Sequence, residues 1–149
     1  MDEFKKVIRQ LIDLFGQLTK IERVKLDGAA GKHIGTVEDC VTQQQALMLR
    51  LRGLEQARER AQEKAGYGGM QFRDILAKVP DSEREELYQL FDELSRKIQM
   101  FQEVNEDTNK ILRTHLYSID KALREKTGNT YKVDGKNDTN VRHMTSRRA

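Results

Sequence analysis

Residues 82–126 have the sequence SEREELYQLFDELSRKIQMFQEVNEDTNKILRTHLYSIDKALREK, in which apolar residues recur every three or four positions. This spacing predicts one long helix with a single apolar seam. At about 1.5 Å per residue the helix would be roughly 65–70 Å long, and it can bury its seam only by packing along other helices. The sequence therefore predicts an all-α fold, an elongated antiparallel helical bundle or coiled coil of long helices. The seam positions are Leu87, Phe91, Leu94, Ile98, Phe101, Asn105, Thr108, Leu112, His115, Ile119 and Ala122.

The first 65 residues carry two shorter apolar stripes that are separated by a glycine-rich stretch. The first stripe consists of Phe4, Val7, Leu11, Leu14, Leu18 and Ile21. Lys25 takes the next seam position, and three glycines follow at positions 28, 31 and 35, where each costs a helix about 0.8–1 kcal/mol relative to alanine. The second stripe resumes at Val37 with a shifted phase, which is typical of a bent or locally unwound helix. We expect one long helix over residues 2–65, kinked near residues 28–35, in preference to two separate helices.

Glycine and proline set the remaining helix boundaries. Three glycines within residues 66–69 allow the chain to end the first arm and reverse. Residues 70–79 then have the pattern of a short amphipathic helix, which Pro80 stops. The long last helix is expected from residue 82 to residue 126.

The positive charge of the chain is concentrated after the long helix. The formal net charge is +3, yet residues 124–149 alone contain seven Lys or Arg against three Asp or Glu, so the rest is close to neutral. Beyond residue 128 the sequence is polar and has no apolar period. We therefore predict a helical bundle domain over residues 1–128 and a flexible basic tail over residues 129–149.

Catalytic and metal chemistry finds no support in the sequence. A metal site in a helical bundle needs Glu three residues before His, but Ala, Leu and Asn stand three residues before His33, His115 and His143. Cys40 is the only cysteine, so it cannot form an internal disulfide, and it lacks the spacing of a metal ligand. We therefore expect a protein that is not an enzyme and that holds no metal or cofactor.

Membranes and nucleic acids are not expected partners. The N-terminal residues MDEFKKVIRQ lack the apolar core of a signal peptide, and no window approaches about 18 consecutive apolar residues. The basic tail could neutralise a few phosphates, but it contains one aromatic residue and the folded body carries almost no net charge. The expected location is the cytoplasm.

Polar residues interrupt the seam of the long helix at Asn105, Thr108 and His115, and Asn109 shares a face with Asn105. A polar layer in a coiled coil penalises wrong helix pairings, so one interpretation is control of helix register. The other interpretation is that the seam is less buried here and binds a partner. The sequence leaves both open.

A broad apolar stripe surrounds and follows this polar block, wider than a contact between two helices requires. Such wide faces commonly receive another helix, although an ordinary bundle core is the alternative interpretation. The tail adds Tyr131 and Val133, two isolated apolar residues that are candidate docking anchors. The stripe consists of Ile111, Leu112, Leu116, Ile119 and Leu123.

Several segments resemble the FlgN-type flagellar type III export chaperones, particularly those of Gram-positive bacteria. They are EDCVTQQQALMLRLRGLEQARE (38–59), FRDILAKVP (72–80), FQEVNEDTNKIL (101–112) and TYKVDG (130–135). The resemblance covers about residues 4–135. The glycine-rich residues 28–35 depart from the family pattern, which favours a helix more strongly there.

This resemblance implies a protein that is not an enzyme. FlgN-type proteins bind hook–filament junction proteins in the cytosol, keep these clients soluble and pass them to a component of the type III export gate. The implied client-binding region lies toward the C-terminal end of the last helix and in the tail. Carried onto this sequence, the candidate residues are Asn105, Asn109, Ile111, Leu112, Leu116, Ile119 and Leu123, with Tyr131 and Val133 in the tail.

The main alternative is a generic coiled-coil adaptor or scaffold protein, which could form a homodimer. A first arm of about 60 residues would be longer than the last helix, and its overhanging apolar stripe would need a partner. The oligomeric state and the identity of the client do not follow from the sequence.

Overall fold

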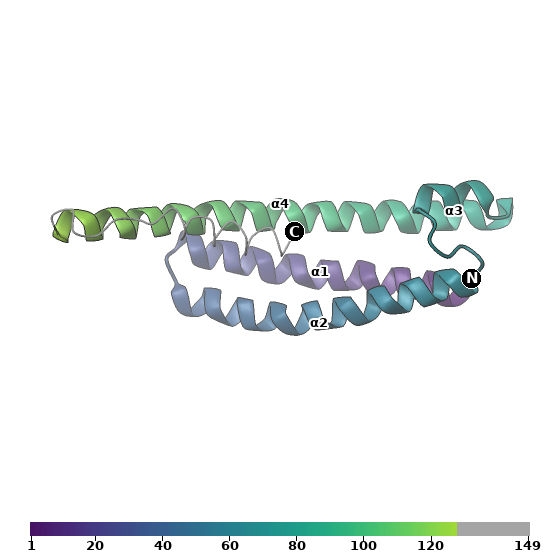
Figure 1. Cartoon of the computed structure of the whole chain (residues 1–149), viewed down its shortest axis with the longest axis horizontal. Coiled ribbons are helices and arrows are strands. Elements are labelled where there is room, and N and C mark those ends of the chain that lie inside the picture. The colour runs from purple at the N-terminus through teal and green to yellow at the C-terminus, as the bar shows by residue number, and fades with distance from the viewer. Residues whose placement is uncertain (128–149) are drawn as a thin grey trace.

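The computed structural model describes residues 1–127 of the 149-residue chain and contains four α-helices in that range (Figure 1). They are α1 (Asp2–Ala30), α2 (Ile34–Lys64), α3 (Phe72–Lys78) and α4 (Asp81–Thr127). The described residues include no strand, and the long helices pack side by side in an elongated bundle. The predicted all-α helical bundle is confirmed.

Helix α1 is the centre of the bundle, because α2 and α4 both pack along it. The connection from α1 to α2 reverses the chain, so these two helices are antiparallel (Figure 1). Contacts between α1 and α4 advance together along both helices, from Phe4 with Phe91 to Phe15 with Phe101, so α4 runs parallel to α1. The long helices therefore have an up-down-up arrangement, and only α2 is antiparallel to its neighbours.

The prediction of one kinked helix over residues 2–65 is wrong, since the chain turns back at Gly31–His33 and forms two helices. The turn is closed by the amide of His33, which donates to the carbonyl of Gly28 over 2.8 Å. Lys32 takes a left-handed conformation with φ of 59°. Gly28 lets the two helices meet closely, because a Cβ at this position would lie 3.0 Å from the Thr36 methyl carbon. The phase shift in the sequence thus marks a reversal of the chain.

The large apolar side chains of the core gather along the first two thirds of α1. Phe4 meets Phe91 edge-on at 6.0 Å, and Phe15 meets Phe101 in the same way at 6.1 Å. Helix α3 closes this end of the bundle, since its Phe72 stacks on Phe91 at 4.2 Å. The buried apolar residues of this core are Phe4, Val7, Ile8, Leu11, Ile12, Leu14, Leu18, Ala61, Ile75, Val79, Leu87, Leu90, Phe91, Leu94 and Phe101.

A buried lysine joins the N-terminal ends of α1 and α4. The Lys5 side chain is only 8% exposed, and its ammonium group pairs with Glu83 and with Glu86, the latter at 2.8 Å. The Arg9 guanidinium lies 2.6 Å from the other oxygen of Glu86. The hydrogen bond to Glu83, followed by that to Glu86, raises the pKa of Lys5. The hydrogen bond from Lys5 is also the main reason why the pKa of Glu86 is lowered.

These shifts predict a specific pH dependence for the variant Lys5→Met, which keeps the apolar stem and removes the charge. Glu86 has a pKa below its ordinary value of 4.5, so its stabilisation is present above that pH and is lost as the pH falls through the lowered pKa. Lys5 has a pKa above 10.5, so its stabilisation is lost only as the pH rises through the raised pKa. Urea unfolding should show the largest difference between wild type and Lys5→Met near neutral pH, and a shrinking difference in acid. The neighbouring exposed Lys6→Met is the control, and an equal loss at all pH values would contradict the prediction.

The turn at Lys32 predicts that Lys32→Gly stabilises the protein by about 0.5–1 kcal/mol. A left-handed conformation costs a residue with a Cβ about 1–2 kcal/mol, and the larger freedom of glycine in the unfolded chain offsets part of that gain. In a continuous kinked helix the same variant would instead lose about 1 kcal/mol. The sign of the change in the free energy of unfolding, measured with urea, therefore distinguishes the hairpin from the kinked arm.

Candidate functional site

The structure divides the predicted client-binding residues between the interior and the surface of the bundle. Asn105 and Asn109 are 6% and 7% exposed. Ile111 and Leu112 are half-buried, one turn further along α4.

The rest of the predicted site lies closer to the C-terminus. Leu116 is 50% exposed, and Leu123 is also exposed. Residue 119 belongs to α4, but the side chain of Ile119 is outside the described part of the structure, as are Tyr131 and Val133. The structure therefore separates a buried polar part of the prediction from an exposed apolar part.

The two asparagines belong to a buried polar layer that joins α1, α2 and α4. We define this polar layer by its residues, Glu22 and Lys25 on α1, Gln44 on α2, and Asn105 and Asn109 on α4. Glu22 and Lys25 are 0% exposed, and the Lys25 ammonium lies 3.7 Å from the Glu22 carboxylate.

Amide groups from the other two helices complete the hydrogen bonds of this buried ion pair. The Gln44 amide nitrogen donates to one carboxylate oxygen of Glu22, and the Asn105 amide nitrogen donates to the other over 3.1 Å. Lys25 donates to the Gln44 amide oxygen over 3.3 Å, and Asn109 donates to that of Asn105 over 3.2 Å. A buried ion pair is tolerated only when its remaining hydrogen-bonding capacity is satisfied in this way.

The polar layer constrains the register of α4 against α1. A shift of α4 by one turn, about 5.4 Å, that brought Phe101 opposite Glu22 in place of Asn105 would leave the carboxylate buried without that donor. Thr108 is also buried here, and its hydroxyl donates to the carbonyl of Val104 on its own helix over 3.0 Å. His115 is half-buried. The position of Asn105 and Asn109 therefore fits the register interpretation of the polar block.

Sequence reasoning missed Glu22 and Gln44. The apolar stripe of α1 was extended to Ile21, but the buried face of the helix passes from Leu18 to Glu22 and then to Lys25, and Ile21 is half-buried. The available signal was Lys25 at a seam position. A buried lysine needs an acidic partner, and Glu22 lies one turn before it on the same face.

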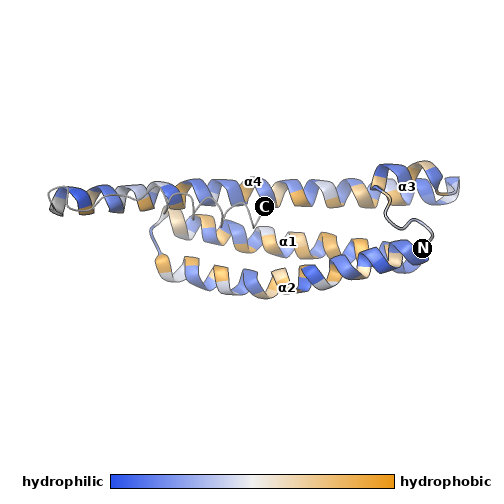
Figure 2. Cartoon of the chain, in the orientation of Figure 1, coloured by the Kyte–Doolittle hydropathy of each residue, from blue (hydrophilic) through white to orange (hydrophobic). Residues whose placement is uncertain are grey.

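Helix α4 continues beyond the ends of α1 and α2 (Figure 1). Because Glu22 lies opposite Asn105, the end of α1 at Ala30 lies opposite about residue 113. We therefore call residues 113–127 the α4 extension. Orange, hydrophobic positions continue along it past the turn between α1 and α2 (Figure 2).

The apolar residues that lead into the α4 extension and continue along it lie on the same face of α4 that is buried in the bundle nearer its N-terminus. Leu112, Leu116 and Leu123 lie seven, eleven and eighteen residues after Asn105, which are close to whole numbers of helical turns. Leu112 is half-buried, whereas Leu116 is 50% exposed. The inner seam of α4 thus leaves the bundle and becomes a surface, and the exposed Tyr117 lies beside it.

Other chemistry is sparse in the described part of the chain. Among these residues no group of three or more His, Cys, Asp or Glu could hold a metal ion. Cys40 is buried, and this burial is the main reason why its pKa is raised, so the group is a neutral thiol near pH 7. Within residues 1–127, no helix has the length and apolarity needed to cross a membrane.

The polar layer predicts that Glu22→Gln lowers the free energy of unfolding by about 3 kcal/mol, because it removes the carboxylate that accompanies a fully buried Lys25. Adding Lys25→Met should recover most of this loss, since the second change removes the buried positive charge. Urea unfolding followed by circular dichroism measures both effects, with the exposed Glu93→Gln as the control. A loss below about 1 kcal/mol for Glu22→Gln, as for a surface ion pair, would contradict the prediction.

Comparison with known proteins gives one result. A protein-family model described as FlgN protein matches residues 1–139. Comparisons with curated proteins and with solved structures find no match. The matched region includes all four helices, the polar layer and the α4 extension. Because the match covers most of the 149 residues, the chain belongs to the FlgN family of flagellar export chaperones.

Proposed function

We propose that this FlgN-family protein acts in the cytosol on hook–filament junction proteins, keeps them soluble and delivers them to the type III export gate. A general role as a flagellar export chaperone follows from the family. The identity of the clients and the delivery step are the proposal. The observation that carries it is the change along the inner face of α4, where Asn105 and Asn109 are buried in the bundle, whereas Leu116 and Leu123 in the α4 extension are exposed.

An exposed seam of this kind suits the capture of a helix. Leu112, Leu116, Ile119 and Leu123 recur every three or four residues, so a client helix could pack against them as α1 packs against the earlier part of the seam. A chaperone that covered a helix through which its client assembles would prevent premature assembly. The proposal extends to Tyr131 and Val133, which follow α4 outside the described residues. Asn105 and Asn109 are almost completely buried in the polar layer, so capture at the α4 extension does not use them.

The seam of the α4 extension favours a reversible complex. Complete burial of a leucine or isoleucine side chain contributes about 1.5–3 kcal/mol, whereas association costs about 4–15 kcal/mol. Four such side chains, of which Leu112 is already half-buried, therefore give a weak complex unless the client also contacts other surfaces. A low affinity is compatible with the release of clients at the export gate.

The homodimeric adaptor was expected because a first arm longer than the last helix would leave an apolar stripe uncovered. Instead, α1 and α2 have 29 and 31 residues, and α4 has 47. The apolar stripe that extends beyond its neighbours belongs to α4.

The proposal predicts that the double variant Leu116→Asp with Ile119→Asp abolishes binding of purified hook–filament junction proteins, because it places two charges on the captured face. Calorimetric titration measures the affinity, and far-ultraviolet circular dichroism should show an unchanged helical signal. Tyr88→Asp is a matched control, since Tyr88 is exposed on α4 far from the extension. Equal affinity of the double variant and wild type would overturn the proposed site.

A further inference from the structure

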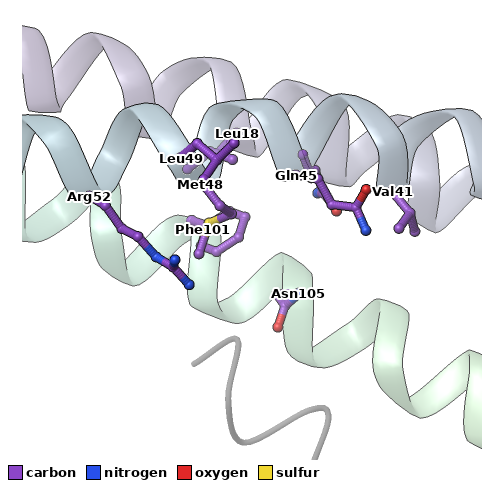
Figure 3. A pocket seen from close by; sticks show the side chains of 9 residues that line it. Leu18, Val41, Gln45, Met48, Leu49, Arg52, Phe101 and Asn105 are labelled. Atoms are coloured by element: carbon purple, nitrogen blue, oxygen red, sulfur yellow. The ribbon is translucent and has the colours of Figure 1, made fainter.

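A cavity between α2 and α4 lies outside the α4 extension. It has a volume of about 330 Å³, and Leu18 of α1 contributes to its wall (Figure 3). We call it the α2–α4 cavity. It arises because α2 and α4 each pack on α1, which leaves space between the two outer helices. Its lining consists of Leu18, Val41, Gln44, Gln45, Met48, Leu49, Arg52, Phe101 and Asn105.

Nearer the N-terminus of α1 the chain itself bridges α2 and α4. There Phe72 of α3 stacks on Phe91 of α4, and the Arg58 guanidinium of α2 lies 5.7 Å from the centre of the Phe72 ring. The Phe72 side chain of α3 therefore connects α2 and α4 at this position. At the α2–α4 cavity, which begins within two turns of Arg58, at Arg52, Leu18 of α1 is the only lining residue from outside α2 and α4.

Helix α2 carries an apolar stripe that the bundle covers only in part, since Met48 is half-buried against the core cluster of Leu14, Leu18 and Phe101. Ile34, Val41 and Met48 are seven residues apart, so they share one side of the helix. Val41 and Met48 line the cavity, and Ile34 is 70% exposed at the start of the helix. Leu49 also lines the cavity and is 67% exposed. The stripe runs from the cavity toward the end of the bundle from which the α4 extension projects.

We propose that an amphipathic helix of the client lies along α2 and α4 as a fourth helix, with apolar side chains in the α2–α4 cavity and an acidic residue beside Arg52. This inference rests on the proposed function and adds a second contact region to it. The cavity walls are mainly apolar, and Arg52 is the only charged residue among those that line it. Its side chain extends from α2 toward α4 (Figure 3). An acidic group on the occupant would complement this charge.

The same charge argues against two other occupants. Residues 128–149 contain five Lys or Arg and two Asp, so this segment would bring further positive charge to Arg52. A second copy centred on the cavity in a two-fold arrangement would place two Arg52 side chains together. A client helix is also continuous with the proposed site, because Asn105 lines the cavity and the face of α4 that carries it leads to Leu112 and Leu116. The added contact supplies the affinity that the α4 extension alone lacks.

The test uses full-length Leu49→Asp and Arg52→Glu, titrated with each purified hook–filament junction protein of the source organism. Both side chains are exposed, so neither variant should disturb the fold, and urea unfolding verifies this. Each variant should weaken client affinity by about tenfold or more, because the first places a charge in the cavity and the second reverses the charge at its rim. Val24→Asp is the matched control, since Val24 is an exposed apolar residue outside the cavity lining, and it should change affinity by less than about twofold.

A photoreactive residue at position 49 provides a second measurement on the otherwise unchanged chain. It should crosslink to a helical segment of the client that contains an acidic residue, whereas the same group at position 24 should not. The inference is overturned if Leu49→Asp and Arg52→Glu bind the client as tightly as the control Val24→Asp does, while the double variant of Leu116 and Ile119 fails to bind it. It is equally overturned if position 49 crosslinks to residues 128–149 or to a second copy. Absence of binding by the wild-type chain would instead contradict the proposed function itself.

Discussion

The buried ion pair between Glu22 and Lys25 is the constraint on which the arrangement of the three long helices depends. Neither group can stay charged in the interior without partners, and α1 alone does not complete their hydrogen bonds. Gln44 on α2 and Asn105 on α4 supply the missing groups. Apolar seams tolerate a shift of one turn at modest cost, whereas a shift that brought Phe101 opposite Glu22 would leave this polar layer without the Asn105 donor. The residue of α4 that lies opposite the end of α1, and therefore the start of the α4 extension, is fixed by these few hydrogen bonds.

The bundle differs markedly on the two sides of this layer. Toward the N-terminus of α1, aromatic and branched aliphatic side chains fill the core, and Lys5 adds ion pairs at the end. Toward the turn between α1 and α2, the buried residues are small or polar, namely Gly28, Ala29, Cys40 and Thr108. Less apolar area is buried there, so the contribution of the hydrophobic effect per residue is smaller. The α4 extension thus projects from the less strongly stabilised end of the bundle.

Sequence reasoning succeeded where one local rule dominated. Pro80 and the long apolar period placed the last helix at residues 82–126, within one residue of α4 at each end. It failed at residues 31–33 because glycines are compatible with both a kink and a turn, and the left-handed conformation of Lys32 has no sequence signal. It also extended the seam of α1 to Ile21 by hydrophobicity alone. Burial of Glu22 instead depends on Gln44 and Asn105, which are distant in the sequence.

The buried and exposed residues of the predicted site, such as Asn105 and Leu116, belong to the same heptad pattern of α4 but have different neighbours in the structure. A heptad pattern predicts which side of α4 is apolar, but it does not predict where the partner helix ends. The α2–α4 cavity has no sequence signal at all, because it depends on how far apart two helices lie when both pack on a third.

The turn at residues 31–33 is what makes α4 longer than its neighbours. Had residues 2–65 formed one arm, that arm would have exceeded α4 in length, and the whole seam of α4 could have been covered by it. The turn divides the arm into two helices of about 45 Å each, while α4 measures roughly 70 Å. The difference is a stretch of seam, residues 113–127, that no other described helix reaches. The same glycine-rich segment that departs from the usual helical pattern therefore creates the surface on which the proposed capture of clients depends.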